Sequence, residues 1–231
     1  MAKTILVTGS NRGIGLEVVR QYAAAGWQVH ACCRDPERAT ELHALATENQ
    51  KIHLHQLDVT DHGRMTSLAR ELEGHPIDIL FNNAGVYGQD DAEFGNTDEN
   101  LWLRAMRINV IAPMKMMETF IGHVTSSQYK LIACLSSKMG SMADNGSGGS
   151  YVYRSSKAAL NAVLKSAAID LQDRGIRVAI LHPGWVKTGM GGPHAEISTT
   201  ESVTAMRAIL TRMKPEDTGT FYDIDGRVIP W

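Results

Sequence analysis

The chain has 231 residues, which is enough for one domain with a full hydrophobic core and short for two. With 43% hydrophobic and 21% charged residues, its composition is ordinary for a soluble globular protein. The formal net charge of −2 argues against charge-driven binding to nucleic acid or anionic membranes, and three cysteines are too few for a disulfide scaffold.

The first residues, "MAKTILVTG", hold a short apolar run that ends at a glycine, and they lack the pattern of a signal peptide. No stretch of the sequence approaches the roughly 18 apolar residues that span a bilayer. Together with the low cysteine content, these features predict a cytoplasmic protein that binds neither membranes nor nucleic acid.

Short apolar runs alternate along the chain with longer segments of helical periodicity. The runs are rich in Val, Ile and Leu, which suits strands buried on both faces. This alternation predicts βαβ units with right-handed crossovers, hence a doubly wound α/β fold in a single domain over residues 1–231. The expected strands are 3–8, 27–33, 51–57, 77–82, 130–136 and 176–182, with a last strand and an Asp-Gly turn in the tail 219–231; the expected helices lie near 13–25, 36–48, 61–73, 98–122, 151–173 and 198–213.

The stretch "TGSNRGIG", residues 8–15, directly follows the first predicted strand and opens the first helix. Its glycine spacing differs from the usual dinucleotide fingerprint, but the physical reasons are the same. Glycines let the backbone approach a pyrophosphate, and the helix N-terminus offers free N–H groups to the anion. A tight turn without a ligand is the alternative. The candidate cofactor-binding residues here are Gly9, Ser10, Asn11, Arg12, Gly13, Ile14 and Gly15.

The end of the second strand distinguishes the two nicotinamide cofactors. An NAD site carries an acidic residue there for the ribose 2′-hydroxyl. This chain has Arg34, and Asp35 follows where it can cap the next helix. Arg12 is a second cation within reach, and two guanidinium groups favour a 2′-phosphate. NADP(H) is therefore the expected cofactor, and NAD(H) is the alternative if Arg34 is only a solvated surface residue.

Two further segments end predicted strands, at the edge where open α/β sheets bind their ligands. In "LDVTD", Asp58 can accept a hydrogen bond from an adenine amino group, or it can simply cap a turn. In "NNAG", Asn83 offers a side-chain amide, and Ala84 and Gly85 allow the backbone to approach a ligand.

The stretch "YVYRSSK", residues 151–157, holds two tyrosines and a lysine on a predicted helix. Residues four apart share a helical face, so Tyr153 lies with Lys157, whereas Tyr151 lies with Ser155. An ammonium beside Tyr153 favours the phenolate and is expected to lower the pKa of Tyr153 from about 10 toward neutrality. Such a tyrosine can give a proton to a carbonyl oxygen or take one back.

In their order and spacing, these motifs resemble the short-chain dehydrogenase/reductase family over nearly the whole chain. The resemblance implies a Rossmann-like, mainly parallel seven-stranded sheet in the order 3-2-1-4-5-6-7, with helices on both faces. The segments that carry it are "TGSNRGIG" at 8–15, "DV" at 58–59, "NNAG" at 82–85, "INV" at 108–110, "LSS" at 135–137, "YRSSK" at 153–157 and "HPGWVKT" at 182–188.

The resemblance also implies roles for single residues. Tyr153 would be the acid/base, and Lys157 would lower its pKa and bind the nicotinamide ribose. Ser137, preferred over Ser136, would hydrogen-bond the substrate carbonyl, and Asn109 would hold a water for proton relay. Further implied cofactor contacts are Val59 beside Asp58, and Pro183, Gly184, Val186 and Thr188 along the nicotinamide.

One departure concerns the gap between Ser137 and Tyr153, which is longer than in most members of the family. The extra residues fall in "ADNGSGGS", 143–150, where a loop can absorb them but the substrate mouth should change shape. The segment after Thr188 is short and glycine-rich, which argues against a large substrate lid. The long loop and the tail with "DG…PW" resemble the branch of the family that contains C-factor and the Sniffer carbonyl reductase.

The predicted activity is the NADPH-dependent reduction of a small aldehyde or ketone to an alcohol, with specificity set by the loops near 86–97, 138–150 and 189–197. Two alternatives stay open: a C-factor-like signalling protein that uses the fold as a nucleotide sensor, and an NAD-dependent alcohol dehydrogenase. The resemblance implies a homodimer or homotetramer. No metal site is predicted, because His53 and His55 share a strand face but lack further ligands nearby in sequence.

Overall fold

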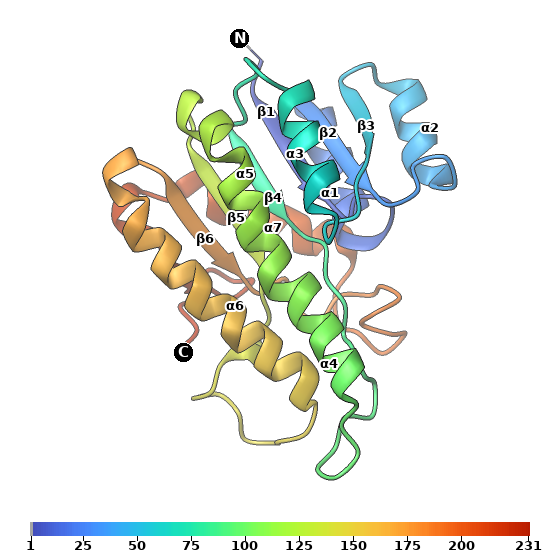
Figure 1. The fold of residues 1–231 in the computed structure, drawn as a ribbon, viewed down its shortest axis with the longest axis vertical. Helices are drawn as coiled ribbons and strands as arrows, with labels where there is room; N and C mark the ends of the chain where they lie inside the picture. The colour runs from blue at the N-terminus through green and yellow to red at the C-terminus, as the bar shows by residue number, and fades with distance from the viewer. Residues whose placement is uncertain (1) are drawn as a thin grey trace.

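The computed structural model describes residues 2–231, and its centre is one parallel sheet (Figure 1). The strand order is β3-β2-β1-β4-β5-β6-β7, so the predicted doubly wound sheet and its order are confirmed. All strands are parallel, but the order in which they join the sheet reverses at β1: β2 and β3 lie on one side of it and β4 on the other. The carboxyl ends of β1 and β4 are therefore the expected place for a ligand. The strands are β1 (Thr4–Thr8), β2 (Gln28–Cys33), β3 (Ile52–Gln56), β4 (Ile79–Asn82), β5 (Leu131–Leu135), β6 (Arg177–Leu181) and β7 (Thr220–Tyr222).

Helices cover both faces of the sheet, because successive strand residues point to opposite sides. In β1, Ile5 and Val7 pack with α1, α2 and α7, whereas Leu6 packs on the other face with α3, α5 and α6. Helices α4 and α5, which follow each other end to end, run beside α6 (Figure 1). The helices are α1 (Gly13–Ala24), α2 (Thr40–Glu48), α3 (His62–Glu71), α4 (Glu99–Met106), α5 (Ala112–Ser126), α6 (Tyr151–Asp170) and α7 (Thr199–Arg212).

The segment predicted as one helix over 98–122 is interrupted by a π-helical turn, Arg107–Ile111, between α4 and α5. Proline explains part of the irregularity. Pro113 has no N–H, so it cannot donate the α-helical hydrogen bond to the main-chain carbonyl of Asn109. Turns of this kind are frequent at functional sites. The predicted helix at 36–48 also differs, since α2 begins only at Thr40, after a turn at Pro36.

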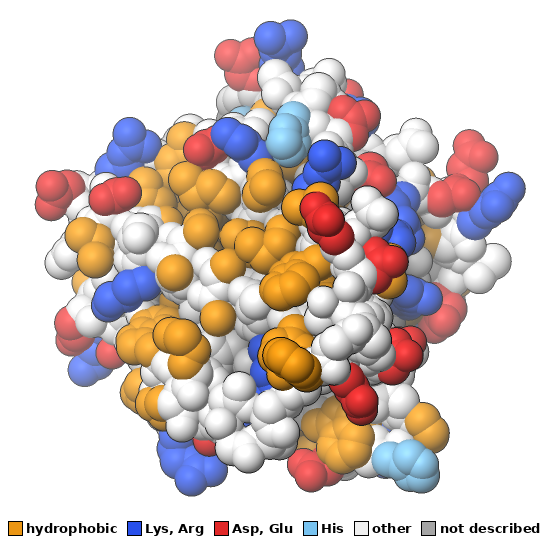
Figure 2. Space-filling view, turned by 60° about the horizontal axis from the view of Figure 1, so that its bottom comes forward, with side chains coloured by type: hydrophobic (Ala, Val, Ile, Leu, Met, Phe, Trp, Pro, Cys, Tyr) orange, Lys and Arg blue, Asp and Glu red, His pale blue; other side chains and the backbone are white. Residues whose placement is uncertain are grey.

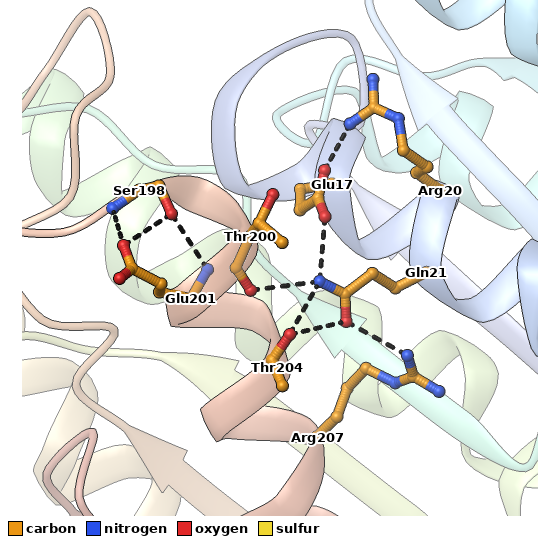
Figure 3. A network of polar contacts seen from close by, with 8 residues as sticks. All are labelled: Glu17, Arg20, Gln21, Ser198, Thr200, Glu201, Thr204 and Arg207. Atoms are coloured by element: carbon orange, nitrogen blue, oxygen red, sulfur yellow. Dashed lines mark hydrogen bonds and ion pairs between the residues drawn. The ribbon is translucent and has the colours of Figure 1, made fainter.

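A polar network joins α1 to α7 and so connects two parts of the chain that both reach the carboxyl edge of the sheet (Figure 3). The Gln21 amide lies at its centre. Its Nε2 donates to Glu17 Oε1 at 2.9 Å, to the Thr200 carbonyl at 3.2 Å and to Thr204 Oγ1 at 3.2 Å. Its Oε1 accepts from Arg207 Nη1 at 3.1 Å. The first helix, which follows the glycine loop, is therefore fixed against the last one.

Candidate active site

A cleft of about 1130 Å³ opens at the carboxyl edge of the sheet. Figure 2 shows the end of the molecule that includes this edge, with apolar side chains gathered at its middle and charged ones toward its margin. Most of the predicted site residues meet in this cleft. Those that line it are Gly9, Asn11, Arg12, Gly13, Ile14, Arg34, Asp58, Val59, Asn83, Ala84, Gly85, Tyr153, Lys157, Pro183 and Thr188.

The glycine loop requires glycine for two separate reasons. Gly9 has φ of +67°, and a Cβ on it would lie 2.9 Å from the Ala84 Cα. Gly15 has an ordinary φ, but a Cβ there would overlap the carbonyl oxygen of Gly9. The Asn83 amide sits in the same space and donates to the carbonyls of Thr8 (2.8 Å) and Gly9 (2.9 Å). Asn83 therefore shapes the loop, which the prediction of a direct cofactor contact did not anticipate.

Ser10 also differs from the prediction. Its hydroxyl and its backbone N–H both donate to the carbonyl of Cys32, at 3.0 and 3.1 Å, and the side chain is fully buried. It fastens the glycine loop to the end of β2 instead of facing the cleft. No side chain caps the N-terminus of α1, where Arg12 is the N-cap residue, so the first N–H groups of the helix are left for a ligand.

Two arginines lie at the end of the cleft beside β2, and the lining of the cleft also includes the carboxylate of Glu41. Arg12 and Arg34 are both exposed there, and within residues 2–231 no carboxylate forms an ion pair with either guanidinium. The carboxylate of Asp35 is engaged elsewhere. It accepts from the backbone N–H of Arg38 at 3.3 Å and lies 3.3 Å from Arg38 Nε. Asp35 thus closes a turn before α2. A ribose 2′-phosphate bound here would meet cations, at the place where a NAD site has an acidic residue for the ribose 2′-hydroxyl.

Asp58 lies in the loop after β3, and one of its carboxylate oxygens is left for a ligand. Its Oδ1 accepts from the backbone N–H of Thr60 at 2.9 Å and from the Thr60 hydroxyl at 2.7 Å. Burial raises the pKa of Asp58, but these hydrogen bonds outweigh it and hold the pKa below its usual range, aided by Arg34 and Arg104. The turn-capping alternative and the adenine contact are therefore compatible, because each can use a different oxygen.

Asn109 lies in the π-helical turn and is 1% exposed. Its side chain is committed to neighbours: Oδ1 accepts from the Val86 N–H at 2.9 Å, and Nδ2 donates to the Val86 carbonyl at 2.8 Å and to Ser156 Oγ at 3.0 Å. The amide thus holds the loop after β4. The implied role of Asn109 in holding a water stays a prediction.

Tyr153 and Ser137 lie side by side next to the cleft: Tyr153 lines it, and of the two serines Ser136 is the one among the lining residues. Tyr153 lies in the first turn of α6 and Ser137 follows β5; they are 9% and 7% exposed. Burial raises the pKa of Tyr153 to about 12, and a hydrogen bond with the Ser137 side chain acts in the opposite direction. Ser136 points elsewhere, since its hydroxyl donates to Asn161 Oδ1. These contacts favour Ser137 over Ser136 as the partner of Tyr153, and Tyr151, two residues earlier, is exposed; the catalytic roles of Ser137 and Tyr153 stay predictions.

Lys157 is buried one helical turn from Tyr153, as the spacing predicts. Its Nζ donates to the Leu135 carbonyl at 2.8 Å and lies 5.7 Å from the centroid of the Tyr153 ring. The expected lowering of the Tyr153 pKa is wrong for this structure, because desolvation of the phenol dominates and the ammonium is turned toward β5. Burial also lowers the pKa of Lys157 itself to about 8.

The segment 183–188 closes the cleft opposite the glycine loop. Gly184 has φ of +80°, and a Cβ there would lie 2.6 Å from Ile197 Cδ1. Val186 is buried and pairs with Ile197 in a short parallel bridge. Ser202 of α7 donates to the Pro183 carbonyl at 2.6 Å. Gly184 and Val186 therefore support the segment from behind, while Pro183 and Thr188 face the cleft.

The loop 138–150 is tied down at both sides, although it is rich in glycine and serine. Ser141 Oγ donates to the Pro230 carbonyl at 2.6 Å, and the N–H of Met142 donates to the Trp231 carbonyl at 2.8 Å. On the other side, Arg154 Nη2 donates to Ser147 Oγ at 2.8 Å. The extra residues before Tyr153 thus form a held rim beside the site.

Several residues that line the cleft were not anticipated. Leu103, Arg104 and Arg107 reach it from the helix predicted over 98–122, opposite Asp58. The i, i+3 spacing of the two arginines places them on one helical face, and this was the available signal. Tyr87 was missed as well: its ring stacks on Tyr153, and nothing in the local sequence indicates that contact.

The short chain dehydrogenase family model matches residues 3–199 of the chain. The chain belongs to this family. Among the relatives of this short-chain dehydrogenase is C-signal of Myxococcus xanthus, 38% identical over 167 residues, which are 72% of this chain and 100% of C-signal. The carbonyl reductase Sniffer of D. melanogaster has a TM-score of 0.94 at 31% identity, and the match covers 100% of both chains.

An NADPH-bound carbonyl reductase from chicken fatty liver has a TM-score of 0.93 at 32% identity, over 100% of this chain and 99% of that one. These likenesses confirm two predictions for this short-chain dehydrogenase: its family and its resemblance to the branch with C-factor and Sniffer. The prediction of an enzyme of the oxidoreductase class is confirmed with them.

No helix within residues 2–231 combines the length and apolar character that a membrane crossing needs. The same part of the chain contains no group of three or more His, Cys, Asp or Glu side chains placed to bind a metal ion. His53 and His55 lie on β3, at the edge of the sheet, and His55 Nε2 is 2.9 Å from His30 Nδ1.

Proposed function

We propose that this short-chain dehydrogenase is an NADP(H)-dependent carbonyl reductase in which Tyr153 supplies the proton. The observation that carries the proposal is the buried Tyr153 in the wall of the cleft, with Lys157 one helical turn away and Ser137 as its hydrogen-bond partner. Two hydroxyl groups side by side can both hydrogen-bond one carbonyl oxygen. The carbonyl reductases Sniffer and that of chicken fatty liver, the latter NADPH-bound, support this choice.

The residues of the cleft fit NADP(H). Glycine at positions 9 and 15 lets the loop fold tightly against Ala84 and Asn83, and the uncapped N-terminus of α1 lies at the cleft end that holds Arg12 and Arg34. When bound, the cofactor supplies a hydride to the carbonyl carbon of the substrate. The residues proposed to hold it are Gly9, Asn11, Arg12, Gly13, Ile14, Arg34, Asp58, Val59, Ala84, Gly85, Lys157, Pro183 and Thr188.

Tyr153 then acts as general acid. Because its pKa is raised to about 12, the phenol is protonated at neutral pH and can donate to the substrate oxygen as negative charge develops there. The Ser137 hydroxyl stabilises the same oxygen. Lys157 lies one helical turn away, with its Nζ 5.7 Å from the centroid of the Tyr153 ring, and its proposed role is to bind the nicotinamide ribose. The phenolate regains its proton from water, by the path on which Asn109 is predicted to hold one.

Replacing Tyr153 by Phe tests the proposal. Tyr153→Phe keeps the ring but removes the proton, so NADPH oxidation with an aldehyde or ketone should fall by at least about a hundredfold. NADPH binding, followed by fluorescence titration, should stay unchanged. Tyr151→Phe is the matched control on the exposed side of α6, and it should keep most of the activity. Full turnover in Tyr153→Phe would exclude Tyr153 as the proton donor.

The cofactor preference has its own test in Arg34. Arg34→Asp replaces a phosphate-binding cation by the acid that a NAD site uses, so the ratio of NADPH to NADH affinity should fall by at least about tenfold. Arg174→Asp makes the same charge change in the segment between α6 and the start of β6, at the amino end of the sheet. It should leave the ratio of NADPH to NADH affinity unchanged. An unchanged ratio in Arg34→Asp would mean that Arg34 is a solvated surface residue and would reopen NAD-dependent alcohol oxidation.

A second candidate is a regulatory protein that uses the cleft as a nucleotide sensor, and its support is the 38% identity with C-signal. A screen of NADPH oxidation over aldehydes, quinones, diketones and ketoacyl esters separates the two functions. Turnover that depends on Tyr153 supports the reductase. Tight NADPH binding without turnover of any of these carbonyl classes supports the sensor.

A further inference from the structure

Tyr87 lies against the face of the proposed proton donor. Its ring centroid is 4.6 Å from that of Tyr153, and the two rings are inclined by only 24°. Tyr87 belongs to the loop after β4, whereas Tyr153 belongs to α6, so the contact joins segments that are distant in sequence. One face of the Tyr153 ring is thereby covered by another aromatic side chain instead of by solvent.

The hydroxyl of Tyr87 makes a second contact, with Ser150 Oγ at 2.9 Å. Ser150 is the N-cap residue of α6, but its side chain does not cap the helix. It also has a left-handed backbone, with φ of 49°, which is costly for a residue with a Cβ. A serine in this position normally bonds the first turn of its helix, so its use on Tyr87 marks a contact between the loops 86–97 and 138–150.

The backbone around Tyr87 is held in place by close packing on α6. Gly88 has φ of +94°, and a Cβ there would lie 2.6 Å from Val152 Cγ1. Val152, Ala92 and Ala105 form a small buried cluster, and Trp102 Nε1 donates to Ser155 Oγ at 2.8 Å. The loop therefore has little freedom to lift Tyr87 away from Tyr153.

We infer that Tyr87 is a positioning residue: its ring holds the Tyr153 side chain in the orientation that faces Ser137, and its hydroxyl links the two loops that flank the substrate. This inference rests on the proposed function for its catalytic consequence. Displacement of a reacting group by about 1 Å can cost two orders of magnitude in rate, so a side chain that restricts the phenol affects turnover without touching the reacting atoms.

The test compares Tyr87→Leu with Tyr87→Phe. Leu removes the stacked ring, so kcat for carbonyl reduction should fall by about tenfold or more, while KM for NADPH is unchanged. Phe keeps the ring, so the kcat of Tyr87→Phe should stay within about twofold of that of the unsubstituted protein. Activity lost equally in both variants would overturn the positioning role of the ring. So would a Tyr87→Leu variant with full kcat and only a raised KM for the carbonyl substrate.

The link between loops is tested by a double-mutant cycle. Ser150→Ala removes the hydroxyl but keeps the Cβ and its backbone strain, so it matches Tyr87→Phe. If the two hydroxyls act through each other, the double variant should show no more change in KM for the carbonyl substrate than either single variant. Fully additive changes in KM would contradict the link.

A measurement independent of turnover separates this inference from the proposed function. In protein labelled with 3-fluorotyrosine, the ¹⁹F resonance of Tyr153 can be assigned by its loss in Tyr153→Phe. It should shift in Tyr87→Leu and keep its position in the control variant Tyr151→Phe, which leaves Tyr87 and Ser150 unchanged. A protein without reductase activity but with this shift would refute the proposed function alone, whereas an unmoved resonance in Tyr87→Leu refutes the stacking role.

Discussion

Lys157 carries an ammonium group into the interior without a compensating carboxylate among residues 2–231. Within the same residues its Nζ donates a hydrogen bond to the Leu135 carbonyl alone, and burial lowers the pKa of Lys157 to about 8. The ammonium is therefore still protonated at neutral pH, but at a cost in desolvation. A polar ligand or a phenolate beside the ammonium would offset that cost.

Gly15 gives the sharpest prediction at the scale of one residue. A Cβ on Gly15 would overlap the Gly9 carbonyl, so Gly15→Ala must displace the glycine loop. We expect a loss of about 1–3 kcal/mol in unfolding free energy, measured by urea titration, and NADPH binding weakened by at least about tenfold. Gly122→Ala is the control, since Gly122 is exposed within α5 with open space around it. Gly122→Ala should raise the free energy of unfolding by about 0.5–1 kcal/mol. A Gly15→Ala variant with the same behaviour would refute the overlap.

At the scale of elements, the pairing of β2 with β3 buries a histidine pair. His30 and His55 lie on one face of these strands with their ring nitrogens 2.9 Å apart, and His30 is 8% exposed. Burial, with the nearby histidines, lowers the pKa of His30 to about 3, and burial lowers that of His55 to about 4. The folded protein thus holds both rings neutral at pH values where the unfolded chain protonates them.

This pair predicts how stability depends on pH. Because the pKa of His30 is lower in the folded than in the unfolded state, its contribution is complete above the ordinary pKa of 6.5 and is lost as the pH falls toward 3. The loss should approach about 1.4 kcal/mol per pH unit for His30 alone, measured by urea unfolding between pH 7 and pH 4. His30→Gln should flatten this slope, whereas His43→Gln, at an exposed position of α2, should not. Equal slopes in both variants would mean that the protonation of other groups causes the loss of stability at low pH.

At the scale of the whole molecule, both core faces depend on the same strands. Ile5 and Val7 contribute to one apolar cluster and Leu6 between them contributes to the other, and the same alternation continues in β4 and β5. Exposing one face therefore removes the support of the other. This arrangement favours the prediction of a single domain over residues 1–231. The predicted homodimer or homotetramer stays a prediction, which light scattering can test.

A single domain predicts one cooperative unfolding transition. Urea unfolding followed by far-ultraviolet circular dichroism and by tryptophan fluorescence should give coincident midpoints, since helices and both apolar clusters lose their packing together. Trp27 packs on one cluster and Trp102 lies beside the loop 86–97, so the fluorescence reports on distant parts of the fold. Two separated transitions would show that the chain unfolds in independent units.

The sequence by itself determined the features that follow from local spacing. The alternation of apolar runs and helical segments predicted the sheet, the glycines at 9, 13 and 15 predicted the tight loop, and the four-residue spacing selected Tyr153 over Tyr151. Each depends on the geometry of the backbone over a few residues, which a sequence displays directly. Only the tertiary structure decided that Ser10 faces Cys32, that burial raises the pKa of Tyr153, and that Tyr87 covers its ring. These features depend on contacts between distant segments, and burial reverses the direction of a pKa shift that a neighbouring charge alone would predict.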